Sequence, residues 1–427
     1  MNFENSLSFA RLLDQRDELK EFRKQFLIPT ENEKEQVYFL GNSLGLQPKT
    51  TRDYIHQVLD QWAKYGVEGF MHGDQPWMDY HDQLIQPLSK IVGALPHEVV
   101  LMNSLTVNLH LMMVSFYQPE GKRKKIICES KAFPSDQYMF ETHIKHCGLK
   151  SEDVIVEVSP RDGEQLVRLE DILAAIEKYK DELALVFWGG INYYTGQLFD
   201  MKSITKAVQS IGAKVGFDLA HAAGNVFLQL HDWNVDFACW CSYKYLNSGP
   251  GAVGAAYIHE RYHQDNSIKR LAGWWGYDKA TRFKMQKGFK PVLTAEGWQL
   301  STPSLVLLAA HKAALEIFEE AGMEAILKKS KMLSDYLTFI LNEINSTQME
   351  KVIDIITPGN ENEKGCQLSI LMPKRGREIY EKFSQHGIFA DWREPEVIRI
   401  APVPLYNTFE EIWIFGNTLQ KILSSHP

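Results

Sequence analysis

The sequence predicts an α/β protein with a large domain, built on a mostly parallel sheet flanked by helices, and a smaller C-terminal α+β domain. Two patterns predict this class. Up to about residue 300, short apolar runs alternate with amphipathic helical stretches, which is typical of right-handed βαβ crossovers. Beyond that point the alternation stops. The composition of the 427 residues, 44% hydrophobic and 23% charged, is that of an ordinary globular protein.

The elements of the large domain follow from the spacing of apolar residues. Helical spacing is present over 8–25 and 50–65. The stretch 98–117 starts extended, breaks at Asn103-Ser104 and continues as a buried helix. After it we expect strands over 124–130, 183–190, 213–221 and 235–240, with helices over 169–179 and 200–212 between them.

The C-terminal part has a different order of elements. We expect a long helical stretch over 304–342, followed by a strand over 366–372, a helix over 376–387, an extended segment over 396–404 and a final helix over 409–423. The chain therefore divides into three predicted regions. They are an N-terminal segment that contributes to the small domain and the active-site entrance (1–45), the large cofactor-binding domain (46–303) and the small C-terminal domain (304–427).

Charge and cysteine content exclude several classes of partner. A net charge of −8 argues against nucleic acid or an anionic membrane as the main partner, and the basic run 121–125 is read as a solvated turn. No apolar run approaches the ~20 residues of a membrane-spanning helix, and the N-terminus has no signal pattern. Five cysteines without a CxxC pair predict reduced thiols and a cytoplasmic protein. No histidine or cysteine pair has metal-ligand spacing, so we predict no metal.

A lysine and an aspartate at predicted strand ends indicate the chemistry. Lys244 follows the strand over 235–240, and Asp218 closes the apolar run before it. A lone loop lysine is usually solvated. A carboxylate beside a reactive lysine, however, is the arrangement that holds pyridoxal phosphate. The amine binds the cofactor aldehyde, and the acid keeps the pyridine nitrogen protonated. The alternative for Asp218 is a cap on the next turn.

Further polar and aromatic residues lie near the same predicted strand ends. Ser104 and Thr106 stand at a helix start, where N–H groups bind phosphate, although plain capping explains either residue alone. Phe133 is placed to stack on a cofactor ring, Ser135 to bond phosphate and Asp136 to contact the ring, although their stretch also reads as a turn.

Two residues beside the lysine and the aspartate complete this set of candidates. Tyr243 precedes Lys244 and offers a hydroxyl to the phosphate. His221 follows Asp218 by three positions and would support the acid or touch the cofactor. The alternative for His221 is a structural role.

Eight stretches together resemble the kynureninase family. They are NSLTVNLHL, KAFPSD, YTGQ, FDLAHAAGN, SYKYLNSGPG, GWWG, TRFKM and IRIAPVPLYN, and the resemblance covers nearly the whole chain. It implies a fold-type-I pyridoxal phosphate enzyme of the aspartate-aminotransferase superfamily. The implied reaction is hydrolysis of L-kynurenine to anthranilate and L-alanine, in tryptophan catabolism or NAD precursor synthesis.

The resemblance also implies roles for individual residues. Lys244 would carry the cofactor and move the α-proton, and Tyr243 would help to protonate the β-carbon. Arg399 would clamp the substrate carboxylate bidentately; its alternative is a surface ion pair. Trp274 would reach the phosphate of a neighbouring subunit, which implies a homodimer with shared sites. The remaining implied cofactor contacts are Leu105, Thr106, Phe133, Ser135, Asp136, Asp218, His221 and Thr302.

Two departures from the family pattern concern the substrate ring. Position 70 is Phe where some relatives have His, and position 302 is Thr where some have Asn. Phenylalanine cannot hydrogen-bond a ring hydroxyl, so we expect unsubstituted kynurenine to be preferred over 3-hydroxykynurenine. Ser301, Thr302 and His72 remain as alternative partners for a hydroxyl.

Two other functions remain open on the sequence alone. A cysteine desulfurase of the same fold needs a nucleophilic cysteine on a mobile loop. Cys366 is the one late candidate, and its apolar surroundings predict a buried strand residue. A catalytically idle scaffold is the other alternative, and the joint presence of Lys244, Asp218 and Arg399 argues against it.

Overall fold

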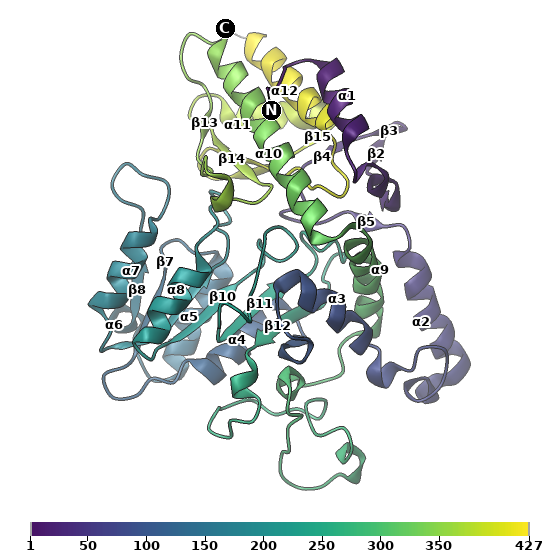
Figure 1. Cartoon of the computed structure of the whole chain (residues 1–427), viewed down its shortest axis with the longest axis vertical. Coiled ribbons are helices and arrows are strands. Elements are labelled where there is room, and N and C mark those ends of the chain that lie inside the picture. Colours follow the sequence, from purple (N-terminus) through teal and green to yellow (C-terminus); the bar gives the residue numbers. More distant parts are fainter. Residues whose placement is uncertain (1, 426–427) are drawn as a thin grey trace.

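The chain forms two layered units around two sheets, as the computed structural model shows (Figure 1). It describes residues 2–425, so residue 1 of the first predicted region and residues 426–427 of the last lie outside it. The large unit holds a seven-stranded sheet in the order β6-β12-β11-β10-β9-β7-β8. Its strands are β6 (Val99–Leu101), β7 (Lys125–Glu129), β8 (Ile155–Val158), β9 (Leu183–Gly189), β10 (Lys214–Asp218), β11 (Phe237–Cys241) and β12 (Gly254–Ile258).

The large sheet is mostly parallel, as the sequence predicts. Strands β11, β10, β9, β7 and β8 pair in parallel along this order. Strand β12 is antiparallel to both of its neighbours, β11 and β6. The parallel arrangement gathers the carboxyl ends of β7, β9, β10 and β11 at one edge, where open α/β sheets bind their ligands.

Helices cover both faces of this sheet because alternate strand residues enter different cores. On β11, Phe237 and Cys239 pack in the core that includes α4 (Leu105–Phe116) and α5 (Pro134–His146). Their neighbours Ala238 and Trp240 pack in the opposite core. The helices of that opposite core are α2 (Thr51–Tyr65), α3 (Asp82–Val92), α7 (Leu169–Lys178), α8 (Met201–Ser210) and α9 (Leu305–Ala321).

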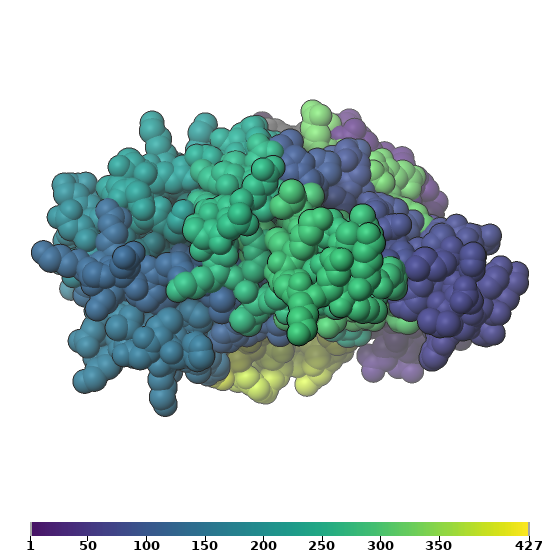
Figure 2. All heavy atoms as spheres, turned by 90° about the horizontal axis from the view of Figure 1, so that it is seen from below, coloured from purple at the N-terminus to yellow at the C-terminus, as the bar shows by residue number. Residues whose placement is uncertain are grey.

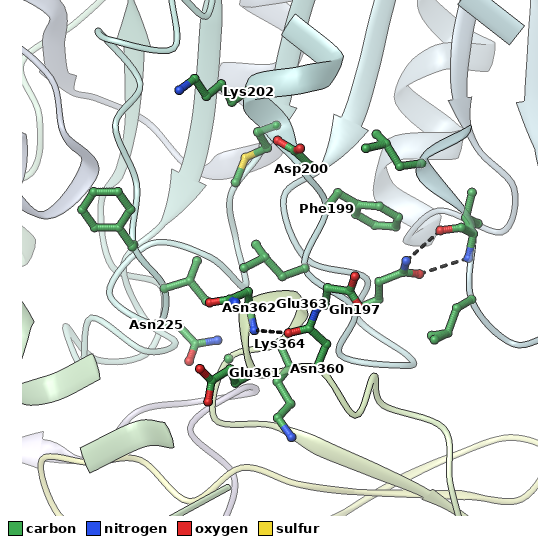
Figure 3. A pocket seen from close by; sticks show the side chains of 18 of the residues that line it. Gln197, Phe199, Asp200, Lys202, Asn225, Asn360, Glu361, Asn362, Glu363 and Lys364 are labelled. Carbon is green, nitrogen blue, oxygen red and sulfur yellow. Dashed lines mark hydrogen bonds between the residues drawn. The ribbon is translucent and has the colours of Figure 1, made fainter. Parts of the chain in front are cut away.

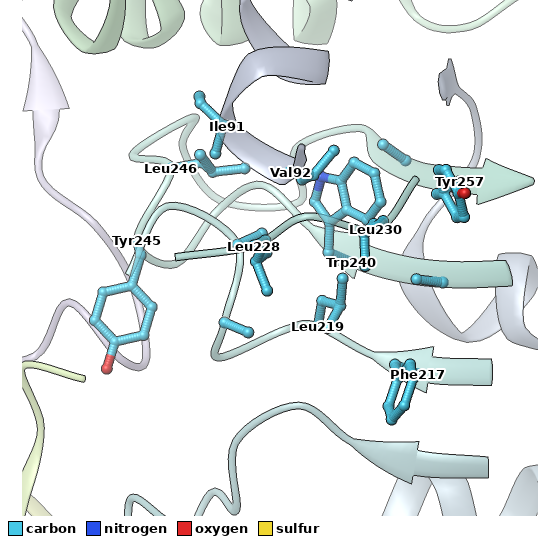
Figure 4. Close-up of a cluster of buried hydrophobic side chains, with 14 of the residues drawn as sticks. Ile91, Val92, Phe217, Leu219, Leu228, Leu230, Trp240, Tyr245, Leu246 and Tyr257 are labelled. Atoms are coloured by element: carbon cyan, nitrogen blue, oxygen red, sulfur yellow. The ribbon is translucent and has the colours of Figure 1, made fainter. Parts of the chain in front are cut away.

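The opposite core holds Trp240 near its centre (Figure 4). Leu219, Leu230 and Tyr257 surround this side chain. All four side chains are fully shielded from solvent. Apolar burial of this extent stabilises a fold strongly, at about 25 cal/mol for each Å² removed from water. It therefore fixes the strand ends that carry the candidate site.

The smaller unit joins the C-terminal part to the N-terminus. A four-stranded antiparallel sheet has the order β13-β14-β17-β16. Helix α1 (Leu7–Arg16) lies against α12 (Phe409–Ser424), and β4 (Val37–Tyr38) pairs with β15 (Ile388–Phe389). The other elements are α10 (Met323–Ser346), α11 (Gly376–Gln385), β13 (Asp354–Ile355), β14 (Leu368–Leu371), β16 (Asp391–Arg393) and β17 (Val397–Ile400).

Two predicted helices are shorter than the apolar pattern indicates. The stretch 304–342 is two helices, α9 and α10, because Gly322 adopts a φ of +73° and ends α9. A positive φ is the usual conformation of a glycine that stops a helix. The stretch 8–25 likewise divides into α1 and the 3₁₀ helix η1 (Lys20–Gln25).

The packing of α9 differs from the predicted boundary at residue 303. Leu308, Leu315 and Phe318 of this helix are buried in the same core as Trp240. Within α10, the residues buried in the small core start at Leu333, whereas Ile326 still belongs to the core of Trp240. We therefore propose that the boundary between the two domains lies within α10.

Candidate active site

A cavity of about 210 Å³ opens at the carboxyl edge of the large sheet. It lies between the ends of β7, β9, β10 and β11 and the starts of α4 and α5. Most of the candidate residues named above line it. They are Ser104, Leu105, Thr106, Phe133, Ser135, Asp136, Asp218, His221, Tyr243 and Lys244.

Lys244 and His221 form the centre of this cavity. Lys244 is 9% exposed, and its Nζ lies 3.1 Å from Nε2 of His221. Burial, the lysine ammonium and the Arg399 guanidinium hold the pKa of His221 well below its usual value, so the imidazole is neutral. Its Nδ1 is buried and has no hydrogen-bond partner in the structure. A buried polar atom of this kind is costly unless a ligand satisfies it.

Two carboxyl groups share one corner of the cavity. Asp218 ends β10, and Asp136 lies in the first turn of α5. Burial raises the pKa of both groups, and the hydrogen bond between them and the charge of Asp218 raise the pKa of Asp136 further. When the pair holds one proton, that proton therefore lies on Asp136, and Asp218 is the ionised member.

Asp218 also caps a turn, which was its alternative role. Its Oδ1 accepts a hydrogen bond of 2.7 Å from the N–H of Ala220. A carboxylate accepts more bonds than this one and the bond from Asp136, so Asp218 keeps acceptor capacity for a further donor. A cationic ring nitrogen placed here would offset the burial of the charge. This donor set fits pyridoxal phosphate.

The first turn of α4 forms a cradle suited to phosphate. Ser104 takes an extended N-cap conformation, but its side chain makes no capping hydrogen bond. Thr106 is the second helical residue rather than the cap. The first N–H groups of a helix lack internal partners and bind anions. A Cβ on Gly254 would lie 3.1 Å from the Ser104 carbonyl carbon and 3.2 Å from the Leu105 nitrogen, so glycine permits this close approach.

Aromatic rings flank the lysine. The centroids of Phe133 and Tyr243 each lie 5.8 Å from the Lys244 Nζ. Phe133 is 41% exposed and meets the ring of Tyr193 edge-on at 5.2 Å. Burial raises the pKa of Tyr243, so its hydroxyl keeps its proton at neutral pH. The exposed face of Phe133 is available for a planar ligand.

Arg399 of the small domain contacts Tyr193, a residue of the cavity, but does not itself line the cavity. It lies on β17, is 1% exposed, and its Nη1 donates to the Tyr193 carbonyl at 2.7 Å. Its Nη2 contacts Asp391 and lies 3.3 Å from the Ser43 hydroxyl. Burial lowers its pKa to about 10. The alternative of a surface ion pair is wrong, because the ion pair with Asp391 is buried. The Nε has no partner in the structure.

Besides Arg399, four predicted residues lie outside the cavity of this chain. Phe70 packs against Trp77 and Trp275, with ring centroids 5.4 and 6.3 Å away. Trp274 is 45% exposed on the long segment between β12 and α9. Ser301 and Thr302 are exposed near the end of that segment. The fold of one chain does not bring these side chains to Lys244.

Two cavity residues with polar side chains were not predicted from the sequence. Glu129 ends β7 and is 5% exposed; burial raises the pKa of its carboxyl to about 7. The sequence did contain a signal for Glu129, because it closes a predicted strand in the same way as Asp218. Tyr193 contributes its ring to the cavity and its carbonyl to Arg399. No pattern in the sequence distinguishes this tyrosine from Tyr194.

Other features of the described residues lie apart from this cavity. A larger cleft of about 850 Å³ lies between α7, α8 and the segment 360–365, and none of the predicted site residues lines it (Figure 3). Glu98, His231 and His259 have ligand atoms within 4.8 Å of one another. His231 already hydrogen-bonds Glu98 at 3.0 Å. The prediction of no metal came from sequence spacing, which does not detect such a cluster.

Cys366 is fully buried, as its apolar surroundings predict. Burial raises the pKa of its thiol to about 12. A thiolate nucleophile requires exposure and a lowered pKa. Its environment is therefore that of an inert core cysteine.

Comparisons with known proteins agree with this geometry. The family model "Aminotransferase class-V" matches residues 37–357, and "Kynureninase C-terminal domain" matches residues 326–419. A kynureninase from Flavobacterium johnsoniae is 55% identical over 99% of both chains. A kynureninase from Nematostella vectensis is 44% identical over 97% of this chain and 93% of its own.

Solved structures share the fold at lower sequence identity. A cysteine desulfurase from Thermococcus onnurineus is 18% identical with a TM-score of 0.77, covering 95% of this chain and 98% of its own. At this identity the likeness shows the fold alone. The predicted fold class is confirmed.

Proposed function

Since this chain belongs to the kynureninase family, we propose that the cavity around Lys244 is its active site. The chain is an enzyme that hydrolyses a carbon–carbon bond in kynurenine with pyridoxal phosphate as cofactor. The observation that supports this proposal most strongly is the arrangement of side chains at the edge of the sheet. A buried lysine lies beside a neutral histidine, and a buried aspartate and a helix start line the same cavity.

Named residues of the cavity suit the three parts of the cofactor. When bound, pyridoxal phosphate supplies an electron sink for the bonds at the substrate α-carbon. Lys244 would hold its aldehyde carbon, and the Asp218 carboxylate would pair with its ring nitrogen. The free N–H groups of Leu105 and Thr106, with the Ser104 hydroxyl, would bind the phosphate.

The chain's own residues then move protons and orient the substrate. Once the substrate is bound, the free Lys244 amine would take the proton from the α-carbon of the substrate. Neutral His221 accepts a hydrogen bond from this amine and keeps it aimed into the cavity. One water adds to the γ-carbonyl and the Cβ–Cγ bond breaks, giving anthranilate. Tyr243, whose hydroxyl stays protonated, delivers a proton to the β-carbon that becomes the methyl group of L-alanine.

Arg399 would bind the α-carboxylate of the substrate. Its Nε lacks a partner, and its Nη1 donates to Tyr193, a residue that lines the cavity; both observations support this role. A bidentate contact also uses Nη2, so Asp391 must yield that nitrogen to the substrate. The buried ion pair would keep the guanidinium charged and oriented until the substrate arrives.

We further propose a cytoplasmic homodimer with shared sites. Trp62, Val67 and Met285 expose 64%, 76% and 70% of their surface. The segment 260–300 projects from the large domain on the same side as the helix α2 region (Figures 1 and 2). Exposed apolar groups of this size mark interaction surfaces. A second copy covering this side would bring Trp274 toward its partner's phosphate site.

Two further findings bear on the location of the enzyme. All five cysteines are free, which fits a reducing compartment. Within residues 2–425, no helix is long and apolar enough to cross a bilayer.

The direct test uses the purified enzyme loaded with pyridoxal phosphate. L-Kynurenine should yield equal amounts of anthranilate and L-alanine. Lys244→Ala should abolish this and also the retention of cofactor through extensive dialysis. Lys202→Ala, on exposed α8 away from the cavity, is the matched control. Turnover that survives in Lys244→Ala would overturn the assignment. Release of alanine from L-cysteine instead would favour the desulfurase alternative.

A further inference from the structure

The connector, defined as residues 192–198 between β9 and α8, joins the two domains. The small domain is hydrogen-bonded to it almost residue by residue. The carbonyl of Tyr193 accepts from Arg399 at 2.7 Å and from Gln367 at 3.2 Å. The other bonds run from Ser369 to the Tyr194 carbonyl (2.6 Å), from Thr357 to the Thr195 carbonyl (2.5 Å) and from the Leu198 N–H to the Glu363 carbonyl (2.8 Å).

The connector ends at the larger cleft of about 850 Å³ described above. Gln197 forms a β-bridge with Lys364 of the small domain and hydrogen-bonds the backbone of Val167 (Figure 3). The connector thus contacts the small domain along its length. Its conformation sets where the carbonyl that holds Arg399 lies.

Asn192 fixes the conformation of the connector. Its Oδ1 accepts from the N–H groups of Tyr194 and Thr195 at 2.8 and 2.7 Å. Its backbone closes a turn with Gly196 and Gln197. Because Oδ1 is committed to these donors, the amide Nδ2 must point away from them. It donates a bond of 2.6 Å to Oε1 of Glu129.

Glu129 is a buried carboxyl group that the proposed mechanism does not use. The other titratable groups in its surroundings are the thiol of Cys128 and those of the cavity, which are Asp136, Asp218, Lys244, neutral His221, Tyr193 and Tyr243. Burial raises its pKa to about 7, and the bond from Asn192 opposes that rise. An ionised acceptor holds an amide donor more strongly than a neutral one. The hydrogen bond between Glu129 and the Asn192 amide therefore becomes stronger as Glu129 loses its proton.

We propose that Glu129 is a positioning residue, whose carboxylate holds Asn192 and thereby the Tyr193 carbonyl that aligns Arg399 for the substrate carboxylate. This inference rests on the proposed role of Arg399. It links the end of β7 in the large domain to a substrate contact supplied by the small domain. Deprotonation of Glu129 strengthens the binding of a ligand that carries a carboxylate and leaves a ligand without one unaffected.

The test measures ligand binding to the pyridoxal phosphate-loaded enzyme by its change in absorbance. Glu129→Gln keeps the size and the acceptor oxygen but removes the charge. We expect its affinity for L-alanine above pH 7 to fall by about fivefold, the difference between a charge-assisted and a neutral hydrogen bond. Affinity for L-alaninamide should not change. The ratio of wild-type to variant affinity for L-alanine should rise from pH 6 to pH 8, which cancels the titration of the ligand itself.

Control variants make each outcome decisive. Glu157→Gln, exposed on the neighbouring strand, should match the wild type. Asn192→Ala should reproduce the defect, and the double variant should add nothing to it. Asn192→Ala also carries the test if Glu129→Gln does not fold. Wild-type affinity in both single variants, or equal losses for alanine and alaninamide, would overturn the inference. Unchanged alanine binding in Arg399→Lys would instead overturn the proposed role of Arg399.

Discussion

Asp218 is the member of a buried carboxyl pair that loses its proton first, which makes it the best single-residue probe of the cofactor. Replacing it by Asn leaves the shape of the corner unchanged but removes the partner of the ring nitrogen. Breaking a buried ion pair costs about 3–5 kcal/mol. We therefore expect Asp218→Asn to lower kcat/KM for kynurenine by a factor of about 10² or more.

The matched variant for this test is Asp136→Asn. Because the shared proton lies on Asp136, this change should cost much less activity than Asp218→Asn. Steady-state kinetics and cofactor content of the two variants decide the matter. A larger loss of activity in Asp136→Asn than in Asp218→Asn would contradict this assignment, because it would mean that Asp136 carries the charge.

Glu129 also makes the stability of the cofactor-free protein depend on pH. Its folded pKa, about 7, is higher than the ordinary 4.5 of an unfolded glutamate. The folded protein therefore binds the proton more tightly, and this group's contribution to stability is lost as pH rises from about 4.5 to 7. The loss is of the order of 3 kcal/mol. Urea unfolding should show Glu129→Gln gaining stability over the wild type across this interval. A constant difference between the two proteins would contradict the raised pKa.

Phe70 tests the choice of substrate ring. An apolar ring at this position leaves a hydroxyl of 3-hydroxykynurenine without a partner from this residue. Phe70→His would supply one hydrogen bond, worth about 1 kcal/mol. We expect the ratio of kcat/KM for 3-hydroxykynurenine to that for kynurenine to rise about fivefold. Phe70→Leu, which adds no donor, should leave the ratio unchanged. If the wild type already prefers the 3-hydroxy compound, then Ser301, Thr302 or His72 serves the hydroxyl instead.

At the scale of elements, the start of α4 depends on a glycine in the neighbouring strand. A Cβ on Gly254 would lie 3.0 Å from the Asn108 amide and 3.1 Å from the Ser104 carbonyl carbon. Gly254→Ala would therefore push the first turn of α4 away from β12. The N–H groups of Leu105 and Thr106 would lose their aim at the phosphate.

We expect Gly254→Ala to weaken cofactor binding about tenfold, the effect of about 1.4 kcal/mol. Titration of the cofactor-free protein with pyridoxal phosphate, followed by fluorescence, measures this change. Gly359→Ala is the control, because a Cβ there meets open space at an ordinary φ. Cofactor affinity equal to that of the wild type in Gly254→Ala would show that α4 does not hold the phosphate.

The elements also show what sequence patterns can and cannot predict. Residues at strand ends, such as Asp218 and Lys244, were predictable because parallel strands deliver their carboxyl ends to one edge. The break at Gly322 was not, because an isolated glycine in an apolar helical pattern is compatible with either a continuous or a broken helix. The donors to the Tyr193 carbonyl, Arg399 and Gln367, depend on how the two domains pack. Local spacing therefore contains no signal for them.

At the scale of the whole molecule, the four predicted residues outside the cavity fit one explanation. Trp274, Phe70, Ser301 and Thr302 lie on or near the segment between β12 and α9. A second copy would complete its neighbour's site with this segment. The site of one chain would then be incomplete without its partner, so activity would require association.

Mixed dimers test this sharing directly. Lys244→Ala removes the lysine from one chain, and Trp274→Ala removes the tryptophan from another, so each variant alone should be nearly inactive. In a mixed dimer, the chain with Trp274→Ala keeps its own Lys244 and receives Trp274 from the partner. One intact site is restored. Random assortment of equal amounts should therefore recover about a quarter of wild-type activity, since half of the dimers are mixed and each has one working site.

The same mixture distinguishes a shared site from a site that each chain builds alone. If Trp274 served its own chain, the mixed dimer would contain one site without the lysine and one without the tryptophan, and mixing would recover nothing. The variants must exchange subunits by mild unfolding and refolding, with wild type mixed with Lys244→Ala as the reference. Size-exclusion chromatography with light scattering supplies the assembly state of each sample. A monomeric wild type with full activity would refute the shared site altogether, because the exposed aromatic side chains of this segment would then have no part in the reaction.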